Sequence, residues 1–380
     1  MTAPVALAPP SKAGAVLAEV SGERPLALVD DRVAGTAWGR SLLPVLGDAA
    51  RGEVLLLPAD PTLGRARAVA RRILEGGNDS VIAVGGGALL DVARLAWFAA
   101  GAGIEDVIRH LARGRAGYVM LPVHVPSRVI ALPTTLGTGA EASRVVCVIT
   151  GGRRRLVAAP GFEAKAYVHD PGAYASLGVA EVRSSLLEVA LRVIGPYVGS
   201  MPDEDTDRAA VAVLADLLAM APHVLARDPA ATSRFAELSC ATHSDALLAR
   251  RAPFSPRLWY LANELSAEAG ISKMTAHAAL LPAFACRAES GDSRWAVPGR
   301  ARELVTALRP GCDPARGLVA LVGDLLPLDA VAIDVDPHAV ASRALSAWGA
   351  GLPMLAGLAR PDLVAIYAEA CTAHRFVPTA

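Results

Sequence analysis

The sequence has no excess of charge of one sign, and this absence bears on its partners. Lys+Arg and Asp+Glu both number 37 in 380 residues, so neither a basic surface for nucleic acid nor an acidic tail is indicated. The basic run Arg153-Arg154-Arg155 is short, and we interpret it as a solvated turn. Nucleic acid is therefore not an expected partner.

The sequence also lacks paired cysteines. Its five cysteines are scattered, their number is odd, and no two are spaced as CxxC. This pattern is typical of reduced thiols in a cytoplasmic protein. None of the five stands in a pattern of metal ligands, so no cysteine metal site is expected.

Long apolar runs are missing as well. The run Val211–Ala221 is broken by Asp216, and we expect no segment of the roughly 20 apolar residues that a membrane helix needs. The first residues, Met1–Pro10, carry no basic residue before an apolar run, so we expect no signal peptide. A cytoplasmic protein without a membrane partner is the expectation.

What the sequence does contain is a large apolar fraction and enough length for two domains. Hydrophobic residues make up 53% and charged residues 19% of the chain, as in a globular protein. Up to about residue 175, strand-like and helix-like segments alternate with short connections, which predicts a parallel, doubly wound α/β sheet. The expected strands are Leu26–Val29, Glu53–Leu57, Val81–Val84, Val129–Leu132, Val145–Thr150 and Ala166–His169, and the expected helices are Gly39–Leu46, Leu63–Glu75 and one from Ala88.

From residue 176 to 380, alanine- and leucine-rich segments with a period of 3.6 residues replace the strands. We expect an all-α second domain. Its helices are predicted over Ala180–Gly195, Asp205–Ala226, Ala231–Arg250, Leu258–Ala269, Lys273–Ala288, Arg300–Ala307, Ala315–Leu325, Pro337–Ser346 and Pro361–His374.

The first domain contains a pattern suited to phosphate. The strand Val81–Val84 runs directly into Gly85-Gly86-Gly87 and then into a helix. Glycines let an anion approach the backbone closely, and the first-turn N–H groups and the helix dipole face it. A glycine-rich βα turn without a ligand is the plainer interpretation.

Two further stretches follow strands of the same sheet. Pro133–Glu141 is a polar loop of small hydroxyl residues and glycines after the strand Val129–Leu132. Asp30-Asp31 follows the first strand, where a carboxylate can accept hydrogen bonds from a ribose diol or can simply begin a helix. Ligands of α/β sheets bind at such strand ends.

Together these motifs resemble those of the iron-containing alcohol dehydrogenase superfamily, which includes glycerol dehydrogenase and dehydroquinate synthase. The superfamily's G-G-G-S-x-x-D stands here as residues 85–91, GGGALLD, and its P-T-T-x-G-T-G-S-E as residues 133–141, PTTLGTGAE. The resemblance spans nearly the whole chain. It implies a Rossmann-like domain at 1–175, a helical substrate domain at 176–380 and a nicotinamide cofactor in the cleft.

The resemblance also implies which residues bind the cofactor. The three glycines are expected against the pyrophosphate, with Asp91 nearby. The acidic position at Asp31 favours an unphosphorylated ribose and hence NAD over NADP. The residues carried over are Asp31, Gly85, Gly86, Gly87, Asp91, Thr134, Thr135 and Thr138.

The chain departs from the superfamily at the metal site. Members bind a divalent metal through an Asp and three His, of which the first two lie one turn apart on a helix. Here Glu188 stands at the Asp position and Arg192 at the first His position. Glutamate can bind a metal, as it does in relatives like dehydroquinate synthase, whereas arginine cannot.

The other two histidine positions are changed too. Alignment on Leu280-Leu281-Pro282 puts Lys273 where the last His belongs, and the remaining His falls near Trp259 or Tyr260. Lysine binds a metal only when deprotonated, and two cations would repel a divalent ion. We therefore predict that the usual metal site is absent.

Charged side chains could take over part of the metal's role, which is to polarise the substrate hydroxyl and stabilise the alkoxide. Arg192 could hold a substrate carboxylate with two hydrogen bonds. Lys273, its pKa lowered by a neighbouring cation, could take the hydroxyl proton, with Tyr260 or His277 as the alternative base.

Two other interpretations of these residues stay open. Glu188 and Arg192 are four residues apart and could form an ordinary helix salt bridge, with His277 packed in the core. Alternatively, His243 or His277 could supply substitute metal ligands.

The resulting hypothesis is an NAD-dependent, metal-independent dehydrogenase that oxidises a hydroxyl of a carboxylate-bearing substrate. This could be a hydroxy acid, or the C-terminal Thr of a ribosomal peptide, which would be oxidised and decarboxylated as in the daptide-type natural-product branch. The alternatives are a metal-dependent alcohol dehydrogenase, a sugar-phosphate cyclase, and a non-catalytic NAD-fold partner in a biosynthetic complex. The resemblance implies a homodimer or larger assembly.

Overall fold

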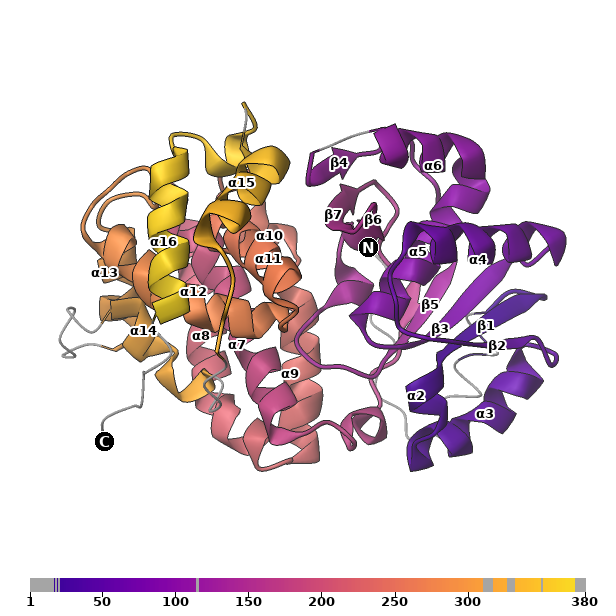
Figure 1. Ribbon diagram of the computed structural model, residues 1–380. Coiled ribbons are helices and arrows are strands. Elements are labelled where there is room, and N and C mark those ends of the chain that lie inside the picture. The colour runs from indigo at the N-terminus through magenta and orange to yellow at the C-terminus, as the bar shows by residue number, and fades with distance from the viewer. Residues whose placement is uncertain are drawn as a thin grey trace. The chain divides into compact units, whose positions relative to one another are not determined.

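The computed structural model describes residues 17, 19, 21–113, 116–309, 317–326, 332–349 and 351–372. Contacts within the chain divide it into two compact units. The sheet unit contains the described residues up to Gly178 together with Ala226–Ala241 (Figure 1). The helical unit contains Val179–Leu225 and the described residues from Thr242 onward.

The sheet unit is built on five parallel strands in the order β2-β1-β3-β5-β8. The chain passes from β1 to β2 on one side and then to β3 on the other side of β1, so the switch point lies between β1 and β3. The doubly wound parallel sheet expected from the sequence is confirmed. The strands are β1 (Pro25–Asp30), β2 (Val54–Leu57), β3 (Ser80–Gly85), β5 (Val129–Pro133) and β8 (Ala166–Tyr167).

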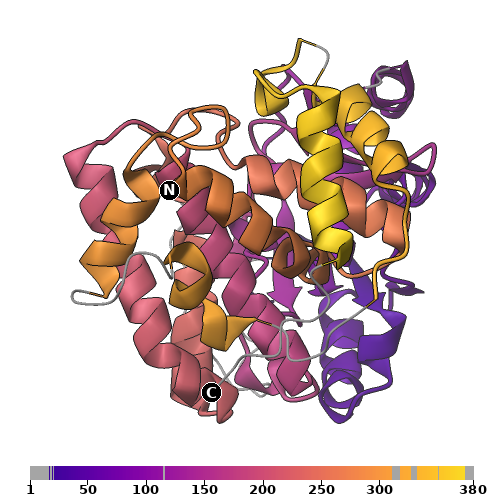
Figure 2. The same ribbon diagram turned by 60° about the vertical axis from the view of Figure 1, so that its left-hand side comes forward.

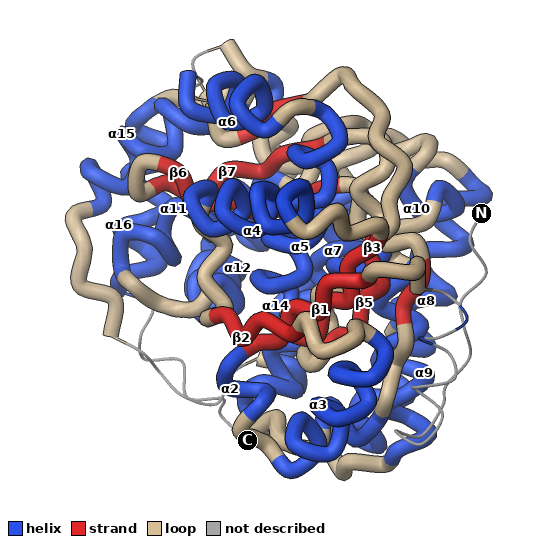
Figure 3. Tube along the Cα trace, turned by 90° about the vertical axis from the view of Figure 1, so that its right-hand side faces the viewer, coloured by secondary structure: helices blue, strands red, loops and turns tan. Residues whose placement is uncertain are grey.

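The central strands are buried on both faces. Because successive side chains point to opposite sides of the sheet, each strand contributes to two cores. Residues such as Ala83 belong to a core with α4, α5 and α6, whereas Ile82 and Val84 pack with α3 (Figure 3). Both cores are mainly aliphatic, and the first also contains the rings of Phe98 and Phe162. The helices of this unit are α2 (Asp31–Ala34), α3 (Ala37–Ala49), α4 (Leu63–Glu75), α5 (Gly87–Ala102), α6 (Ile104–Arg113) and α9 (Pro229–Ala241), with the short 3-10 turns η1 (Ala140–Ala142) and η2 (Pro171–Tyr174).

A second, three-stranded sheet has the order β4-β7-β6, formed by β4 (Tyr118–Met120), β7 (Arg153–Ala158) and β6 (Val145–Thr150). It corrects the expected solvated turn at Arg153–Arg155, because these arginines begin a strand. The true turn is Gly151-Gly152, whose positive φ angles suit a two-residue hairpin between β6 and β7. Arg155 is buried, and its Nε donates to the carbonyl oxygen of Ala116 at 2.9 Å.

All described elements of the helical unit are helical, as expected. Ala231–Arg250, predicted as one helix, is instead broken after α9, and the chain re-enters a helix at α10 with Ser244 at the N-cap. Figure 2 turns this unit forward. Its elements are α7 (Val179–Val198), α8 (Glu204–Leu225), α10 (Asp245–Leu248), α11 (Arg257–Ala269), α12 (Lys273–Glu289), α13 (Arg300–Leu308), α14 (Gly317–Leu321), η4 (Gly323–Leu325), α15 (Pro337–Trp348), η5 (Pro353–Leu355) and α16 (Arg360–Thr372).

Two of the predicted helices extend outside the described residues, at Ala315 and at residues 373–374. The packing of the rest follows neighbouring pairs, with α11 against α12 and α15, and α12 against α16 and α7. The substitutions at the expected metal positions therefore lie on α7, α11 and α12, which contact one another.

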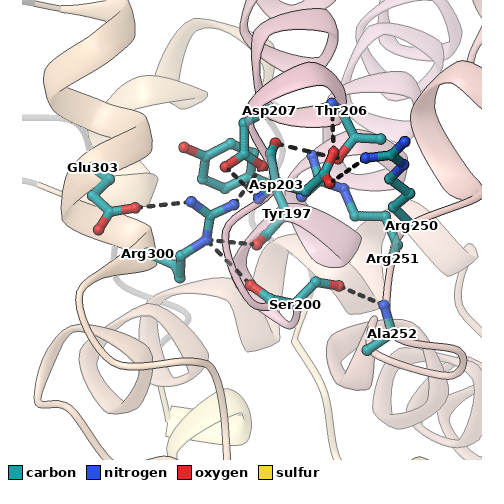
Figure 4. A network of polar contacts seen from close by, with 10 residues as sticks. All are labelled: Tyr197, Ser200, Asp203, Thr206, Asp207, Arg250, Arg251, Ala252, Arg300 and Glu303. Atoms are coloured by element: carbon teal, nitrogen blue, oxygen red, sulfur yellow. Dashed lines mark hydrogen bonds and ion pairs between the residues drawn. The ribbon is translucent and has the colours of Figure 1, made fainter.

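A buried ion network holds α7, α8 and α13 together (Figure 4). Asp207 Oδ1 accepts from Arg300 and from Arg251, each at 2.6 Å, and the Arg300 guanidinium lies 3.9 Å from the centre of the Tyr197 ring. Burial raises the pKa of Asp207, but the two arginines outweigh it and hold the pKa below its usual value. The carboxylate therefore stays charged inside the unit.

One helix corrects the expectation that no segment is long and apolar enough to cross a membrane. The 22 residues of α8 meet that test by length and composition, and α5 and α6 meet it only as a pair bent by 117°. Yet α8 packs against α7 and α10 and carries Asp207 in the ion network, as a bundle helix does. The expectation of no membrane contact stays a prediction.

Candidate functional site

The carboxyl edge of the parallel sheet brings the predicted cofactor residues together. β1 ends at Asp30, whose side chain accepts from the backbone N–H of Arg32 and so begins α2. The next residue, Asp31, is exposed. β3, the neighbour of β1, ends at Gly85, so Asp31 and the glycine turn lie at the switch point of the sheet.

The glycine turn (residues 85–87) and the loop after β5 that carries the threonines (residues 134–139, the threonine loop) contact each other. A Cβ on Gly86 would lie 3.0 Å from Thr135 Cγ2, and one on Gly85 would lie 2.6 Å from Leu89 Cδ2. The loop begins where β5 continues beside β3, with the N–H of Thr134 donating to the Gly85 carbonyl oxygen at 3.0 Å. Side chains in place of these glycines would therefore fill the space beside the turn and press against Thr135 and Leu89.

The start of α5 leaves its first-turn N–H groups without a side-chain partner. The N-cap is Gly86, which offers no side chain to accept from them. Close by, the Thr135 hydroxyl is buried and has no hydrogen-bond partner. Helix N–H groups without a side-chain cap, a close-lying backbone and an unpaired hydroxyl fit a phosphate group. With Asp31 beside them, these residues fit a dinucleotide.

Asp91 has a structural connection that the sequence did not indicate. It forms an ion pair with Arg94, and its other oxygen accepts from the backbone N–H of Cys147 at 2.9 Å. Arg94 is buried and also donates to the Ser143 carbonyl oxygen. Asp91 therefore fastens α5 to β6, close behind the threonine loop.

In the helical unit, Glu188 and Arg192 lie on one face of α7. Their charged groups are 3.5 Å apart, and Arg192 also donates to the Thr242 hydroxyl at 3.0 Å. Both side chains are mostly buried, with 19% of Glu188 and 12% of Arg192 exposed. The helix salt bridge therefore exists, but at 3.5 Å it is longer than a strong charge-assisted hydrogen bond.

Lys273, His277 and Trp259 form a second group. The Lys273 ammonium lies 3.5 Å from the centre of the Trp259 ring, and the His277 ring meets the same indole edge-on at 4.8 Å. The His277 Nδ1 is 2.8 Å from the Lys273 carbonyl oxygen. A carbonyl oxygen only accepts, so Nδ1 carries the proton and Nε2 is a buried acceptor with no partner.

His277 is a neutral residue in this setting. Burial, and then the nearby Lys273 charge, lower its pKa to about 3. A group with this pKa accepts a hydrogen bond at neutral pH but is a weak proton acceptor. Its ring lines an apolar pocket with Leu191 and Gly195 of α7 and with Trp259.

Tyr260, the other alternative base, packs against a different ring. It is 5% exposed, and its ring packs 4.9 Å from that of Trp348. Trp348 in turn donates to Glu264 at 2.9 Å. The structure thus brings the Trp259 ring against Lys273 and His277, and the Tyr260 ring against Trp348.

The side chains at the superfamily's metal positions do not fit a metal ion. Glu188 is paired with a guanidinium, which is never a ligand, and Lys273 covers the Trp259 ring. Burial keeps His277 neutral and its Nε2 could bind a metal, but one imidazole beside the cations of Lys273 and Arg192 does not make a metal site. Over the described residues, no group of three metal-type ligands forms around these positions.

A group of metal-type ligands does form in the sheet unit, where no metal site was expected from the sequence. Glu141, His169 and Cys240 place one ligand atom each within 4.8 Å of one another, and all three are buried. This corrects the prediction that no cysteine stands in a metal-like cluster. The ligands are 28 to 99 residues apart, so no local spacing reveals them. The four described cysteines form no disulfide.

Comparison with known proteins supports the resemblance. Residues 10–195 match the model of the family "Iron-containing alcohol dehydrogenase". The phosphonoacetaldehyde reductase of Streptomyces viridochromogenes is 30% identical over 161 residues, which are 40% of this chain and 39% of that protein. The matched part thus spans well under half of that relative.

Solved structures extend the likeness to the rest of the chain. The NADH-dependent butanol dehydrogenase A of Thermotoga maritima has a TM-score of 0.77 at 14% identity, covering 95% of this chain and 94% of that one. The sulfoacetaldehyde reductase of Bifidobacterium kashiwanohense, solved in complex with NAD+, has a TM-score of 0.73 at 17% identity, covering 98% and 97%. At these identities the likeness shows the fold.

Proposed function

We propose that this chain, whose resemblance to the iron-containing alcohol dehydrogenases is confirmed, is an NAD-dependent oxidoreductase that interconverts a hydroxyl and a carbonyl group. The observation that carries the proposal is the edge of the sheet unit. There a bare helix N-terminus, a glycine turn and an unpaired Thr135 hydroxyl fit phosphate, and Asp31 stands beside them.

The cofactor's phosphates would lie against the backbone of Gly85, Gly86 and Gly87 and accept hydrogen bonds from the first turn of α5. The exposed Asp31 carboxylate would accept from a ribose diol and repel a 2′-phosphate, which favours NAD over NADP. When bound, the nicotinamide supplies the hydride acceptor for oxidation and, in reduced form, the hydride donor for reduction.

The substrate would carry an acidic group. Arg192 and Lys273 place two cations on contacting helices of the helical unit, where the superfamily has metal ligands. The loose 3.5 Å pairing of Arg192 with Glu188 leaves a substrate acid able to compete for the guanidinium. The names of two relatives support this class, since phosphonoacetaldehyde and sulfoacetaldehyde are aldehydes with an acidic group.

Lys273 would handle the proton. In reduction its ammonium gives a proton to the developing alkoxide, and in oxidation the neutral amine takes the proton of the hydroxyl. Both directions balance, because the substrate carbon exchanges a hydride with the nicotinamide and the substrate oxygen exchanges a proton with Lys273. The His277 Nε2 would accept a hydrogen bond from the hydroxyl and so orient it. The cofactor residues belong to the sheet unit and the substrate residues to the helical unit.

A screen with paired substrates tests the proposal. NAD+ with hydroxy acids and with a Thr-ended peptide, and NADH with acidic aldehydes, are compared with neutral alcohols and aldehydes of equal chain length. We expect NADH formation or loss, with kcat/KM higher for the acidic members by about 10- to 100-fold, the scale of one charge-assisted contact. Carbon dioxide released with the peptide would identify a β-keto acid product.

Each alternative has its own outcome in this screen. Equal rates with neutral substrates would contradict the acidic class. A sugar phosphate consumed without net NADH would indicate the cyclase. Tight NAD+ binding without turnover of any substrate would indicate that the chain is a non-catalytic partner in a biosynthetic complex. A homodimer or larger assembly, a cytoplasmic location and the peptide substrate remain proposals, and light scattering on the purified protein measures the first.

A further inference from the structure

The ligand group of the sheet unit joins three segments that are distant in the chain. Glu141 lies in η1 after the threonine loop, His169 follows β8, and Cys240 is in the last turn of α9. Glu141 Oε1 is 3.0 Å from His169 Nε2 and 3.0 Å from Cys240 Sγ, and the nitrogen and sulfur are 3.8 Å apart. The three residues are 4%, 4% and 6% exposed.

Hydrogen bonds alone do not satisfy this group. Both donors converge on Oε1, and the second carboxylate oxygen, Oε2, is buried without a partner. A buried carboxylate oxygen without a hydrogen-bond partner is unfavourable, because the group has lost its water and gained nothing in exchange. A cation within the group would supply that partner.

We propose that Glu141, His169 and Cys240 bind one Zn²⁺ ion. Carboxylate oxygen, imidazole nitrogen and thiolate sulfur are all zinc ligands, and three of them leave the fourth position for water. Zinc–ligand distances of about 2.0–2.3 Å put the ligand atoms of a tetrahedron about 3.3–3.8 Å apart. The observed separations of 3.0, 3.0 and 3.8 Å need only small adjustments to match.

The site would fasten α9 to the sheet unit. α9 belongs to this unit although the chain reaches it only after α7 and α8. It contacts η1 and η2, which follow the threonine loop and β8. The Tyr167 ring stacks on His169 at 5.1 Å and would support the ligand from behind. A bound ion would therefore stabilise the folded unit by linkage and would take no part in the hydride chemistry.

Cobalt substitution tests the site without relying on activity. The purified chain is stripped with a chelator, and Co²⁺ or Zn²⁺ is added back with measurement of bound metal. We expect one equivalent of either metal, a near-ultraviolet thiolate-to-cobalt charge-transfer band, and a higher melting temperature with zinc. Cys240→Ser should lose the band and the zinc-dependent rise, whereas Cys286→Ser, an exposed cysteine of α12, should keep both.

His169→Gln provides a second variant if Cys240→Ser does not fold, and circular dichroism checks both. It should bind cobalt more weakly by 10-fold or more, as one lost ligand implies. Two results overturn the site: the absence of a thiolate band from the wild-type chain with stoichiometric cobalt, or a band that Cys286→Ser removes. Neither result bears on NAD turnover, so this inference and the proposed function fail separately.

Discussion

The carboxyl edge of the parallel sheet and the faces of α7, α11 and α12 differ in what carries their chemistry. At the sheet edge the working groups are backbone N–H groups, glycine gaps and one hydroxyl. On the helices they are side chains, and those at the metal positions expected from the resemblance are an ion pair and a cation on an indole. The first region fits the cofactor of the superfamily, and the second does not fit its metal.

This difference has a physical reason. A phosphate site made of backbone persists as long as the turn keeps its glycines, because other side chains contribute little to it. A metal site depends on each ligand atom, so exchanging a ligand for a cation removes it altogether. The comparison therefore predicts large effects for single changes in the helical unit and small ones at the sheet edge.

The largest effect is expected for Lys273→Met, which keeps the contact with Trp259 but removes the charge. Loss of the proton-transfer group should lower kcat by about 10²- to 10⁴-fold with little change in NAD+ binding. Stopped-flow measurement of NADH and a binding titration check both parts. Lys165→Met, in the sheet unit, is the matched control, and full turnover by the Lys273 variant would remove this residue from the mechanism.

Asp207→Asn tests whether the helical unit is held by its own ion network. Two buried guanidinium groups would lose their carboxylate, and the free energy of unfolding should fall by roughly 3–5 kcal/mol at pH 7. The pKa of Asp207 in the folded state lies below its value in the unfolded state. The extra free energy of unfolding of the wild type is therefore complete above the unfolded pKa and is lost as the pH falls through the folded pKa.

Urea unfolding at several pH values measures this difference. If the difference in the free energy of unfolding between wild type and variant stayed constant down to acid pH, the role of the Asp207 charge would be contradicted. Asp216→Asn, on the same helix and outside the network drawn in Figure 4, is the matched control and should show a smaller change.

Arg192→Lys sharpens the assignment of the substrate's acidic group. Lysine keeps the charge but loses the two-pronged geometry, so KM for an acidic substrate should rise about 10-fold while neutral substrates are unaffected. Arg183→Lys, on the same helix and donating to the Asp324 carbonyl oxygen, is the control. An equal loss with acidic and neutral substrates would show that Arg192 only supports the fold.

The smallest effect is expected for Thr135→Val, an isosteric change at the sheet edge. It removes the unpaired hydroxyl and nothing else, so NAD+ affinity should fall by about 3- to 10-fold, the value of one hydrogen bond. Thr372→Val, exposed on α16, should bind NAD+ as before. Unchanged affinity for the Thr135 variant would place the phosphates elsewhere.

The sequence predicted the sheet edge well, because local patterns decide it. Strand, glycine turn and helix are contiguous at residues 81–96, and the alternation of elements predicts a parallel sheet, whereas the strand order β2-β1-β3-β5-β8 was not predicted. The hairpin at Gly151-Gly152 was missed, since the neighbouring arginines suggested solvent although Arg155 is buried. The low pKa of His277 follows from burial, which the helical periodicity does not specify.

The group formed by Glu141, His169 and Cys240 could not be predicted from the sequence, for a different reason. It depends on α9 joining the sheet unit, although its neighbours in the chain, α8 and α10, belong to the helical unit. Glu141 and His169 each follow a strand of the parallel sheet, which is a usable signal. Nothing in the spacing of Cys240 pairs it with them, because the contact arises only from tertiary packing.

Turnover by metal-stripped protein tests the central claim that cations have replaced the metal. The chain and its Cys240→Ser variant are freed of metal, checked by circular dichroism below their melting temperatures, and assayed with NAD+ or NADH and the best acidic substrate, with and without added Fe²⁺ or Zn²⁺. We predict that both turn over at the rate of the untreated protein and that added metal leaves this rate unchanged. Turnover lost with the metal and restored by Fe²⁺ in both proteins would contradict the account.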